Sequence, residues 1–283
     1  MANRREFLAG SIGCIGALAF TGLKLEAAAR QPVGLQLYTV RTQAESDLPK
    51  TLAAIRAIGY DEVELYWNVY SHSAAELKRM LGDAGLAAPS GHFDYDGLES
   101  KLDYARELGV KYVVCPMLPH NMWTSADGFL RAAEQFNRWG EKVQELGMQF
   151  GFHNHNYEFK RFGDRTGFEI LTTNSDPKLV KLEMDCYWMV QAGKDPEAMF
   201  EKYGNRIRML HLKDRKAGSA PSQSLDDNAK HFAEFGTGSI HWAPILAKAK
   251  QAGVGHYFVE QDEISGDPIA SIRTSYENAR RML

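Results

Sequence analysis

Cysteine is scarce in this chain of 283 residues. There are three, Cys14, Cys115 and Cys186, and none of them belongs to a CxxC pair. Such an odd, widely spaced set excludes a disulfide framework. We interpret Cys115 and Cys186 as buried packing residues, whereas Cys14 falls in a segment that we expect to be removed.

Concentrated positive charge is also missing. The chain has 33 Lys and Arg against 36 Asp and Glu, a formal net charge of −3, and no run of like charge. A protein that binds a phosphate backbone carries a basic patch or stripe, so we exclude nucleic acid as a partner. A hydrophobic content of 44% over this length favours one large core over two small ones.

The first 29 residues have the pattern of an export signal. Arg4 and Arg5 precede an apolar stretch over 7–23, and three alanines follow at 27–29. The RRxFL arrangement resembles a twin-arginine signal peptide. A Sec signal or an uncleaved membrane anchor is the alternative, but the glycine content and the alanine triplet argue against an anchor. We therefore expect a signal peptide at 1–29, a mature domain at 30–283, a periplasmic or otherwise exported protein, and no stable membrane anchoring after cleavage.

Short β-rich segments alternate with amphipathic ones along the rest of the chain. The expected strands are 33–40, 60–67, 87–93, 110–118, 148–155, 180–185, 207–214 and 256–262. Several of the intervening helices end at a glycine that suits a left-handed C-terminal cap: Gly59, Gly85, Gly109, Gly147, Gly204 and Gly253. Eight such units predict an α/β fold, a single-domain (β/α)8 TIM barrel. A doubly wound sheet is the alternative, but no GxGxxG follows the first strand and no Walker lysine motif is present.

Four polar residues lie at or just beyond the last four expected strands: Glu158, Asp185, His211 and Glu260. The carboxyl ends of barrel strands carry the active site, so we expect these side chains to converge there. Three carboxylates would repel one another unless a cation joins them. The sequence therefore predicts one divalent ion, with Mn2+ as the first choice and Mg2+, Co2+, Zn2+ or Fe2+ as alternatives.

The chain resembles the xylose isomerase-like TIM barrel superfamily, including its sugar phosphate isomerase/epimerase family. The resemblance covers Pro32 to Leu283, and these segments carry it: LQLYTVR, FHNHNYEF, MDCYWMVQAG, HLKD, FGTGSIHW and FVEQD. It implies metal ligands at the four residues named above, and a cis-enediolate whose protons Glu158 and Glu260 exchange as acid and base. Epimerase relatives have a His three residues after the strand-six Asp, where this chain has Trp188.

The remaining candidates surround this tetrad. We expect His155 as a proton shuttle and Lys213 as a cation for an enediolate oxygen, unless Lys213 only pairs with Asp185 or Asp214. The expected substrate-binding residues are Glu64, His92, His153, Trp188, Arg215 and Trp242. Arg215 and Trp242 belong to a long connection that follows the seventh strand, on the expected catalytic face.

These residues predict a metal-dependent isomerase or epimerase that acts on an unphosphorylated sugar or keto-sugar. A metal-dependent lyase or dehydratase on a 3-keto-glycoside or inosose is the alternative, because elimination begins with the same proton abstraction. An AP endonuclease-like hydrolase is disfavoured by the charge, and a noncatalytic sugar-binding protein has no use for the tetrad. A small sugar is the expected partner; self-association and a partner sugar dehydrogenase stay open.

Overall fold

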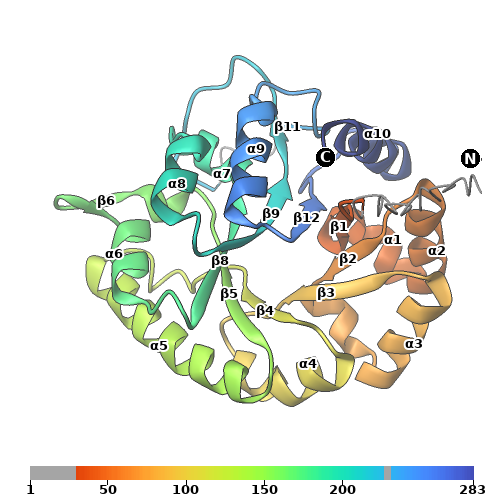
Figure 1. The fold of residues 1–283 in the computed structure, drawn as a ribbon, viewed down its shortest axis with the longest axis horizontal. Helices are drawn as coiled ribbons and strands as arrows, with labels where there is room; N and C mark the ends of the chain where they lie inside the picture. The colour runs from red at the N-terminus through yellow and green to blue at the C-terminus, as the bar shows by residue number, and fades with distance from the viewer. Residues whose placement is uncertain (1–29, 226–230) are drawn as a thin grey trace, which may run out of the picture. The chain divides into compact units, whose positions relative to one another are not determined.

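Eight parallel strands close into a barrel in the computed structural model, which describes residues 30–225 and 231–283 (Figure 1). The expected signal peptide lies outside the described residues. The barrel strands are β1 Gly34–Gln36, β2 Glu62–Leu65, β3 Ala87–His92, β4 Tyr112–Cys115, β5 Gln149–His153, β8 Val180–Asp185, β9 Ile207–Leu212 and β12 His256–Val259. Each strand pairs with its neighbours in chain order, and β12 pairs with β1 to close the ring. The predicted (β/α)8 barrel is confirmed.

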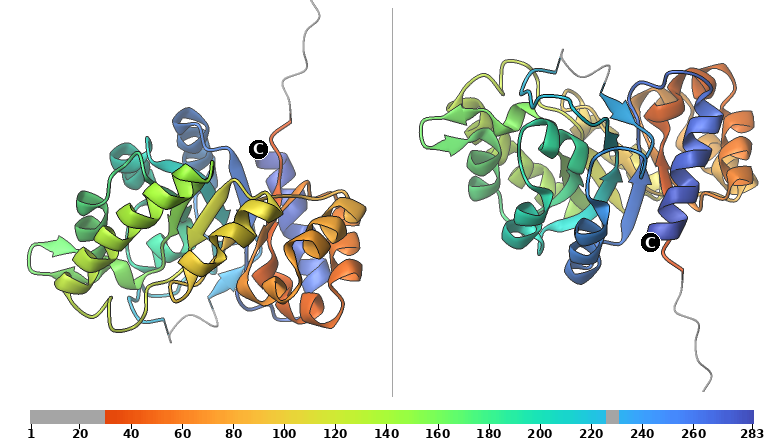
Figure 2. Two further views of the ribbon diagram at one scale, coloured as in Figure 1. Left: turned by 90° about the horizontal axis from the view of Figure 1, so that it is seen from below. Right: turned by 90° about the horizontal axis from the view of Figure 1, so that it is seen from above.

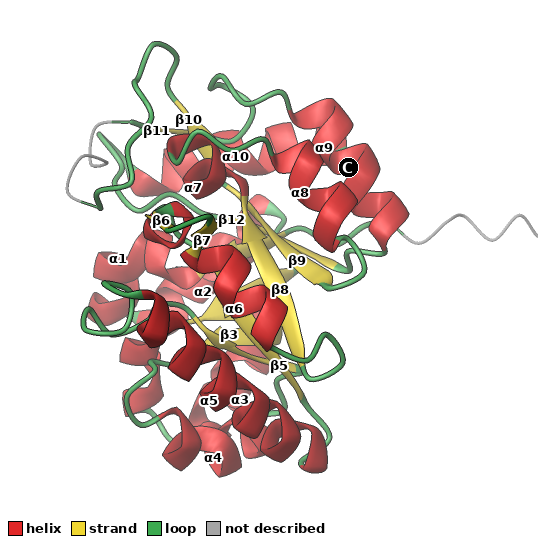
Figure 3. Ribbon diagram, turned by 90° about the vertical axis from the view of Figure 1, so that its left-hand side faces the viewer, coloured by secondary structure: helices red, strands yellow, loops and turns green. Residues whose placement is uncertain are grey.

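The helices lie outside the strands, as two further views and the colouring by secondary structure show (Figures 2 and 3). They are α1 Arg41–Ser46, α2 Leu48–Ile58, α3 Ala74–Ala84, α4 Leu102–Leu108, α5 Ala126–Glu145, α6 Gly167–Asn174, α7 Cys186–Gln191, α8 Pro196–Tyr203, α9 Trp242–Ala252 and α10 Pro268–Met282. Helix α2 illustrates their formation: Asp47 accepts a hydrogen bond from the backbone N–H of Lys50, and Leu52 and Ile55 are buried on one face. Over residues 30–225 and 231–283, no helix combines the length and apolar character that a membrane span requires.

Short 3₁₀ helices follow several strands and carry residues toward the catalytic face. They are η1 Leu37–Val40, η2 Trp67–Ser71, η3 Leu98–Lys101 and η4 Tyr157–Phe159. The first strand is therefore shorter than predicted, because the Gln36 side chain accepts a hydrogen bond from the backbone N–H of Tyr38 and turns the chain. The turn brings Tyr38 over the end of the barrel.

Two antiparallel hairpins and one helix end differ from the prediction. The pairs β6 Arg161–Phe162 with β7 Arg165–Thr166, and β10 Asp214–Arg215 with β11 Phe232–Ala233, lie within connections. Gly204 is right-handed, with a φ of −53°, whereas the other predicted caps have positive φ. At Gly204 a Cβ would come within 2.6 Å of the carbonyl oxygen of Phe200, so close packing accounts for the glycine.

The core has two parts. The larger part packs the helices against the outside of the strands and includes the buried cysteines Cys115 and Cys186, as predicted. The smaller part, which we call the apolar plug, is a separate buried cluster inside the barrel: Tyr112, Val114, Met209 and Phe258. Gly34 makes room for it, because a Cβ there would lie 2.3 Å from the Phe258 ring. Polar side chains of the lumen therefore gather toward the carboxyl ends of the strands.

Candidate active site

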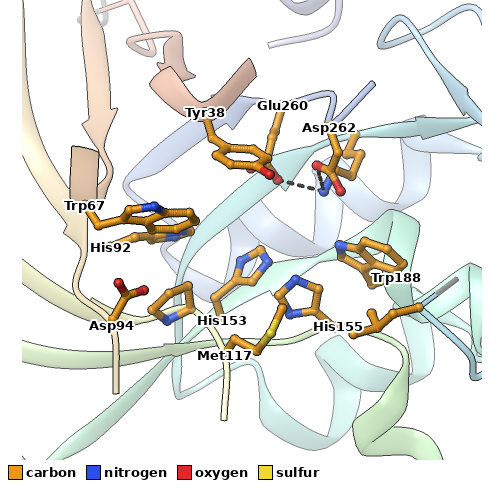
Figure 4. Close-up of a pocket in the computed structure, with 13 residues that line it drawn as sticks. Tyr38, Trp67, His92, Asp94, Met117, His153, His155, Trp188, Glu260 and Asp262 are labelled. Atoms are coloured by element: carbon orange, nitrogen blue, oxygen red, sulfur yellow. Dashed lines mark ion pairs between the residues drawn. The ribbon is translucent and has the colours of Figure 1, made fainter. Parts of the chain in front are cut away.

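A cavity of about 540 Å³ opens at the carboxyl ends of the strands. Each of the eight barrel strands contributes a lining residue, at its end or in the connection that follows: Tyr38, Trp67, His92, Asp94, Pro116, Met117, His153, His155, Trp188, Lys213, Leu225, Glu260 and Asp262. In Figure 4, Trp67 and Trp188 lie on opposite sides, with His153 and His155 between them. A concave site with convergent polar groups at this face of a barrel is the usual place for substrate.

Four buried side chains at the base of the cavity form what we call the upper cluster: His153, Asp185, His211 and Glu260. One donor atom from each lies within 4.8 Å of the others. The Nδ1 atom of His211 is 2.8 Å from Glu260 Oε2 and 3.8 Å from Asp185 Oδ2, while His153 Nε2 is 4.0 Å from that same Asp185 oxygen. Two imidazoles and two carboxylates thus converge from β5, β8, β9 and the residue after β12.

A single lysine lies against this cluster. The Nζ atom of Lys213 is 3.3 Å from Asp185 Oδ2, 2.8 Å from Glu260 Oε2 and 2.6 Å from Asp262 Oδ1. Two of these ion pairs are drawn in Figure 4. The ammonium also lies 5.0 Å from the centre of the Trp188 ring, a cation–π distance. Lys213 therefore points into the lumen and pairs with Asp185, while its sequence neighbour Asp214 points elsewhere.

Burial and charge set the protonation of these groups. Burial raises the pKa of Asp185 to about 6, although the nearby Lys213 opposes this. Burial also raises the pKa of Glu260, but Lys213 and His211 outweigh it, so that the pKa falls below its ordinary value. Burial lowers the pKa of His155 to about 3, and Lys213 adds to the effect, so this imidazole is neutral.

The side chain of Asn154, in the FHNH segment at the end of β5, holds the backbone of Asp185 in place. Asn154 accepts a hydrogen bond from the backbone N–H of Asp185 and donates to the carbonyl oxygen of the same residue, at 3.1 and 3.2 Å. Asp185 then caps α7 by accepting from the backbone N–H of Trp188 at 2.9 Å. These bonds hold the Asp185 carboxylate at the barrel end and place Trp188 against the cavity.

The donors fit a divalent cation. Asp185 Oδ2 and Glu158 Oε1 are buried carboxylate oxygens without a hydrogen-bond partner among the described residues. Asp185 has Lys213 as an ion-pair partner, but this one ammonium faces three carboxylates, those of Asp185, Glu260 and Asp262, and buried charge that is not balanced is costly. A divalent ion would balance that excess, and imidazole with carboxylate is a donor set for Zn2+, Fe2+, Co2+ or Mn2+.

Glu158 lies near the upper cluster but is not one of its four residues. It sits in η4, and its Oε2 accepts a hydrogen bond from the backbone N–H of His155 at 3.0 Å. The residue is fully buried, and this burial raises its pKa to about 8. Its role as a metal ligand stays a prediction, while His153, which we expected to bind substrate, lies within the cluster.

Glu64 and His92 belong to a buried network next to the upper cluster. Glu64 Oε2 is 2.8 Å from His211 Nε2 and 3.2 Å from His92 Nε2, and Glu64 also accepts a hydrogen bond from the Gln36 amide at 2.8 Å. Glu64 is therefore part of a buried network and does not line the cavity, and the substrate-binding role that we expected for it stays a prediction. His92 lines the cavity and joins the same network.

Arg215 and Trp242 do not line the cavity, although we expected both to contact substrate. The Arg215 guanidinium donates to Gln191 and to the carbonyl oxygens of Ser219 and Ala220. The Trp242 indole N–H donates to Asp214 at 2.9 Å.

The Asp214 carboxylate organises the start of α9. It also accepts from the backbone N–H groups of Gly236, Gly238 and Ile240. Gly238 is required there, because a Cβ would lie 2.2 Å from Asp214. The FGTGSIHW segment thus packs around a buried carboxylate, which explains its composition.

Sequence reasoning missed several residues of the site, among them Glu183, Asp262 and Tyr38. Glu183 precedes Asp185 by two positions on β8, and Asp262 follows Glu260 by two. Side chains two apart on a strand share a face, so the alternation that located Lys213 from His211 could have located Glu183 as well. Tyr38 lines the cavity because of the η1 turn, for which the sequence carried no signal that we used.

Known proteins are similar to this chain in sequence and in fold. The model of the xylose isomerase-like TIM barrel family matches residues 52–282. An inosose dehydratase from Lacticaseibacillus casei is 30% identical over 246 residues, which cover 74% of this chain and 81% of that protein. A sugar phosphate isomerase/epimerase structure from Parabacteroides distasonis has a TM-score of 0.72 and 27% identity, over 90% of this chain and 95% of that one.

A more distant solved structure, the IOLI protein with a binding zinc atom, has a TM-score of 0.69 and 15% identity. It covers 89% of this chain and 98% of its own, and at this identity it shows the fold alone. The barrel, the cavity at the strand ends and the family match agree over most of the described residues. This chain belongs to the xylose isomerase-like TIM barrel family.

Proposed function

We propose that this protein is a metal-dependent lyase that dehydrates a keto-cyclitol or keto-sugar. The observation that carries the proposal is the upper cluster with Lys213 at the base of the cavity, an arrangement suited to removing a proton beside a carbonyl group. The relative at 30% identity is an inosose dehydratase, which favours elimination over our first prediction of an isomerase or epimerase. The solved structure at 27% identity keeps epimerisation as the second candidate.

The residues that would hold a divalent ion are His153, Asp185, His211 and Glu260, with Glu158 as a further candidate. When bound, the ion would supply a Lewis acid for the carbonyl oxygen of the substrate. Zinc is bound in the IOLI structure, and zinc and manganese are the first two ions to test here.

The chain's own groups account for the proton transfers. Glu260 faces the cavity as an ionised carboxylate and takes the proton from the carbon next to the carbonyl. The electron pair of that C–H bond forms a new carbon–carbon double bond as the β-hydroxyl departs, and the hydroxyl leaves as water with a proton from Glu158, whose raised pKa of about 8 keeps its carboxyl group protonated at neutral pH. The neutral imidazole of His155 can relay a proton but does not supply one. Lys213, 2.8 Å from Glu260, stabilises negative charge that develops on the substrate oxygen.

The substrate is proposed to be unphosphorylated, because the pattern over 1–29 predicts export. We propose that the protein reaches the periplasm through the twin-arginine pathway. Fusion of residues 1–29 to a reporter that matures only in the cytoplasm tests this. We expect the reporter in the periplasm when Arg4 and Arg5 are intact, and in the cytoplasm when both are replaced by lysine.

The reaction is tested with purified protein loaded with Mn2+ or Zn2+ and incubated in D2O with an inosose or a 3-keto-glucoside. NMR then reports three events separately: deuterium at the carbon next to the carbonyl, loss of the β-hydroxyl, and inversion at a ring carbon. Deuterium uptake with loss of water supports the lyase, and uptake with inversion alone supports the epimerase. Glu260→Gln should slow exchange about 10²–10⁴-fold, whereas the exposed control Glu201→Gln should not. Absence of exchange with every metal and both substrates contradicts the proposal.

A further inference from the structure

A second group of metal-ligating side chains lies beneath the upper cluster. We call it the lower cluster, and it consists of His92, His153, Glu183 and His211. These residues come from β3, β5, β8 and β9, and all four are buried. One donor atom of each lies within 4.8 Å of the others. The proposed reaction uses His153 and His211 to hold its ion, but it does not use His92 or Glu183.

The lower cluster has the spacing of a four-coordinate site. Glu183 Oε2 is 2.7 Å from His92 Nε2, 3.3 Å from His153 Nδ1 and 3.3 Å from His211 Nε2. Ligands around a tetrahedral zinc ion, each about 2.1 Å from the metal, lie about 3.4 Å from one another. The nitrogens of His153 and His211, each 3.3 Å from Glu183 Oε2, already approach this spacing. The His92 nitrogen, at 2.7 Å, would have to move outward.

Two buried atoms of the lower cluster make no hydrogen bond among the described residues, although His153 Nδ1 lies 3.3 Å from Glu183 Oε2. His153 Nδ1 and Glu183 Oε1 are buried side-chain atoms without a hydrogen-bond partner in the part of the chain that the structure describes. Glu64 supplies a second buried carboxylate, 2.8 Å from His211 Nε2 and 3.2 Å from His92 Nε2. Two carboxylates that face three imidazoles make an environment for a divalent cation.

Two histidines separate the clusters and face both of them. His211 presents Nδ1 to Glu260 above and Nε2 to Glu64 and Glu183 below. His153 likewise presents Nε2 toward Asp185 and Nδ1 toward Glu183. Each ring can therefore contribute one nitrogen to each cluster. Filling both sites through these two rings would require each ring to release its remaining N–H proton to solvent and to bridge the ions as an imidazolate, a proton release that accompanies metal binding.

We propose that the lower cluster is a second metal site, selective for a nitrogen-preferring ion such as Zn2+ over Mg2+ or Ca2+. Three imidazoles and one carboxylate form a donor set that suits zinc and not the hard alkaline-earth ions. The apolar plug seals the site from below, so an ion enters through the cavity. The site shares His153 and His211 with the upper cluster, whereas His92 and Glu183 belong to the lower cluster alone and can be replaced without removing an upper-cluster residue.

The test measures metal content of the full-length protein by mass spectrometry after equilibration with Zn2+ and removal of free ion. Wild type should hold about two zinc ions per chain. His92→Gln and Glu183→Gln should each hold about one, and Asp185→Asn should also hold about one. His120→Gln, an exposed histidine outside both clusters, is the matched control and should hold two. Having two lower-cluster variants covers the case in which one of them fails to fold.

Cobalt substitution identifies which site remains, because four-coordinate Co2+ absorbs visible light more strongly than six-coordinate Co2+. The strong absorption should persist in Asp185→Asn and disappear in His92→Gln. One zinc ion per chain in wild type, kept in His92→Gln and Glu183→Gln, overturns the inference and leaves the proposed function intact. An ion that persists in Asp185→Asn, in a protein without exchange activity on either ketone, supports the lower site while the proposed function fails.

Discussion

Replacement of Lys213 by methionine is the sharpest test of the electrostatics of this barrel. The ammonium is almost completely buried and lies within 3.3 Å of oxygen atoms from Asp185, Glu260 and Asp262. Methionine keeps the length and packing of the side chain and removes the charge. Three carboxylates are then left in the lumen without their cation.

Breaking a buried ion pair by removing one partner costs about 3–5 kcal/mol, which for a domain of this size lowers the unfolding temperature by about 6–20 °C. The metal-free protein should show this full effect. A divalent ion at the upper cluster replaces part of the lost charge, and the ion no longer meets repulsion from the ammonium. Added Mn2+ or Zn2+ should therefore raise the unfolding temperature more in Lys213→Met than in wild type.

The assay is thermal unfolding followed by circular dichroism, in chelator and then with a stepwise addition of metal. Lys202→Met is the matched control, because Lys202 pairs with Glu169 on the surface, where such pairs contribute about 0–1 kcal/mol. An unfolding temperature for Lys213→Met within a degree of the Lys202→Met value, both in chelator, would refute the reasoning. If added metal raised the unfolding temperature of wild type and of Lys213→Met by the same amount, the idea that the ion replaces the charge of the lost ammonium would be refuted.

Three further outcomes follow from particular contacts. Trp242→Phe removes the indole bond to Asp214 and should cost about 2 kcal/mol in chemical unfolding, while KM for substrate stays within about twofold; a large rise in KM would return Trp242 to the substrate site. Gly34→Ala should destabilise by about 1–3 kcal/mol, because its Cβ meets the Phe258 ring, and wild-type stability would contradict the packing. Hydrogen bonds from the backbone and side chain of Thr166 and from Lys202 lower the pKa of Glu169 to about 2. The ionised carboxylate therefore stabilises the fold above its unfolded pKa, and this stabilisation is lost as the pH falls toward 2. The difference in unfolding free energy between wild type and Glu169→Gln should shrink from pH 5 to pH 3, and a constant difference would exclude this titration.

Strand alternation explains why much of the site could be predicted from the sequence. Asp185 and His211 end or nearly end buried strands, and Glu260 follows the last one, so a closed parallel barrel brings them to one place. Lys213 shares the parity of His211 and reaches the same lumen. These positions depend on the period of a strand, which a single sequence carries.

Residues beyond the strands could not be placed in this way. Glu158 follows its strand through a 3₁₀ turn, so parity does not determine its direction. Arg215 and Trp242 lie in or after a long connection whose path depends on hydrogen bonds to Asp214 and to Gln191. Such bonds join distant parts of the chain, and no local pattern announces them. Residues 37–40 form a helix and not a strand for a different reason, a local hydrogen bond from the backbone N–H of Tyr38 to the side chain of Gln36.

Among the described residues, the apolar plug lies in the lumen on the side away from the cavity, whose lining includes Tyr38, Trp67 and Met117. We therefore expect ions, substrate and product to enter and leave on the cavity side. Use of one opening predicts an order of binding and release. The metal ion binds before the substrate, and the product leaves before the metal ion. A chelator should therefore strip metal more slowly when a slowly reacting ketone is bound, and the rate of metal loss becomes a measure of how long the mouth stays occupied.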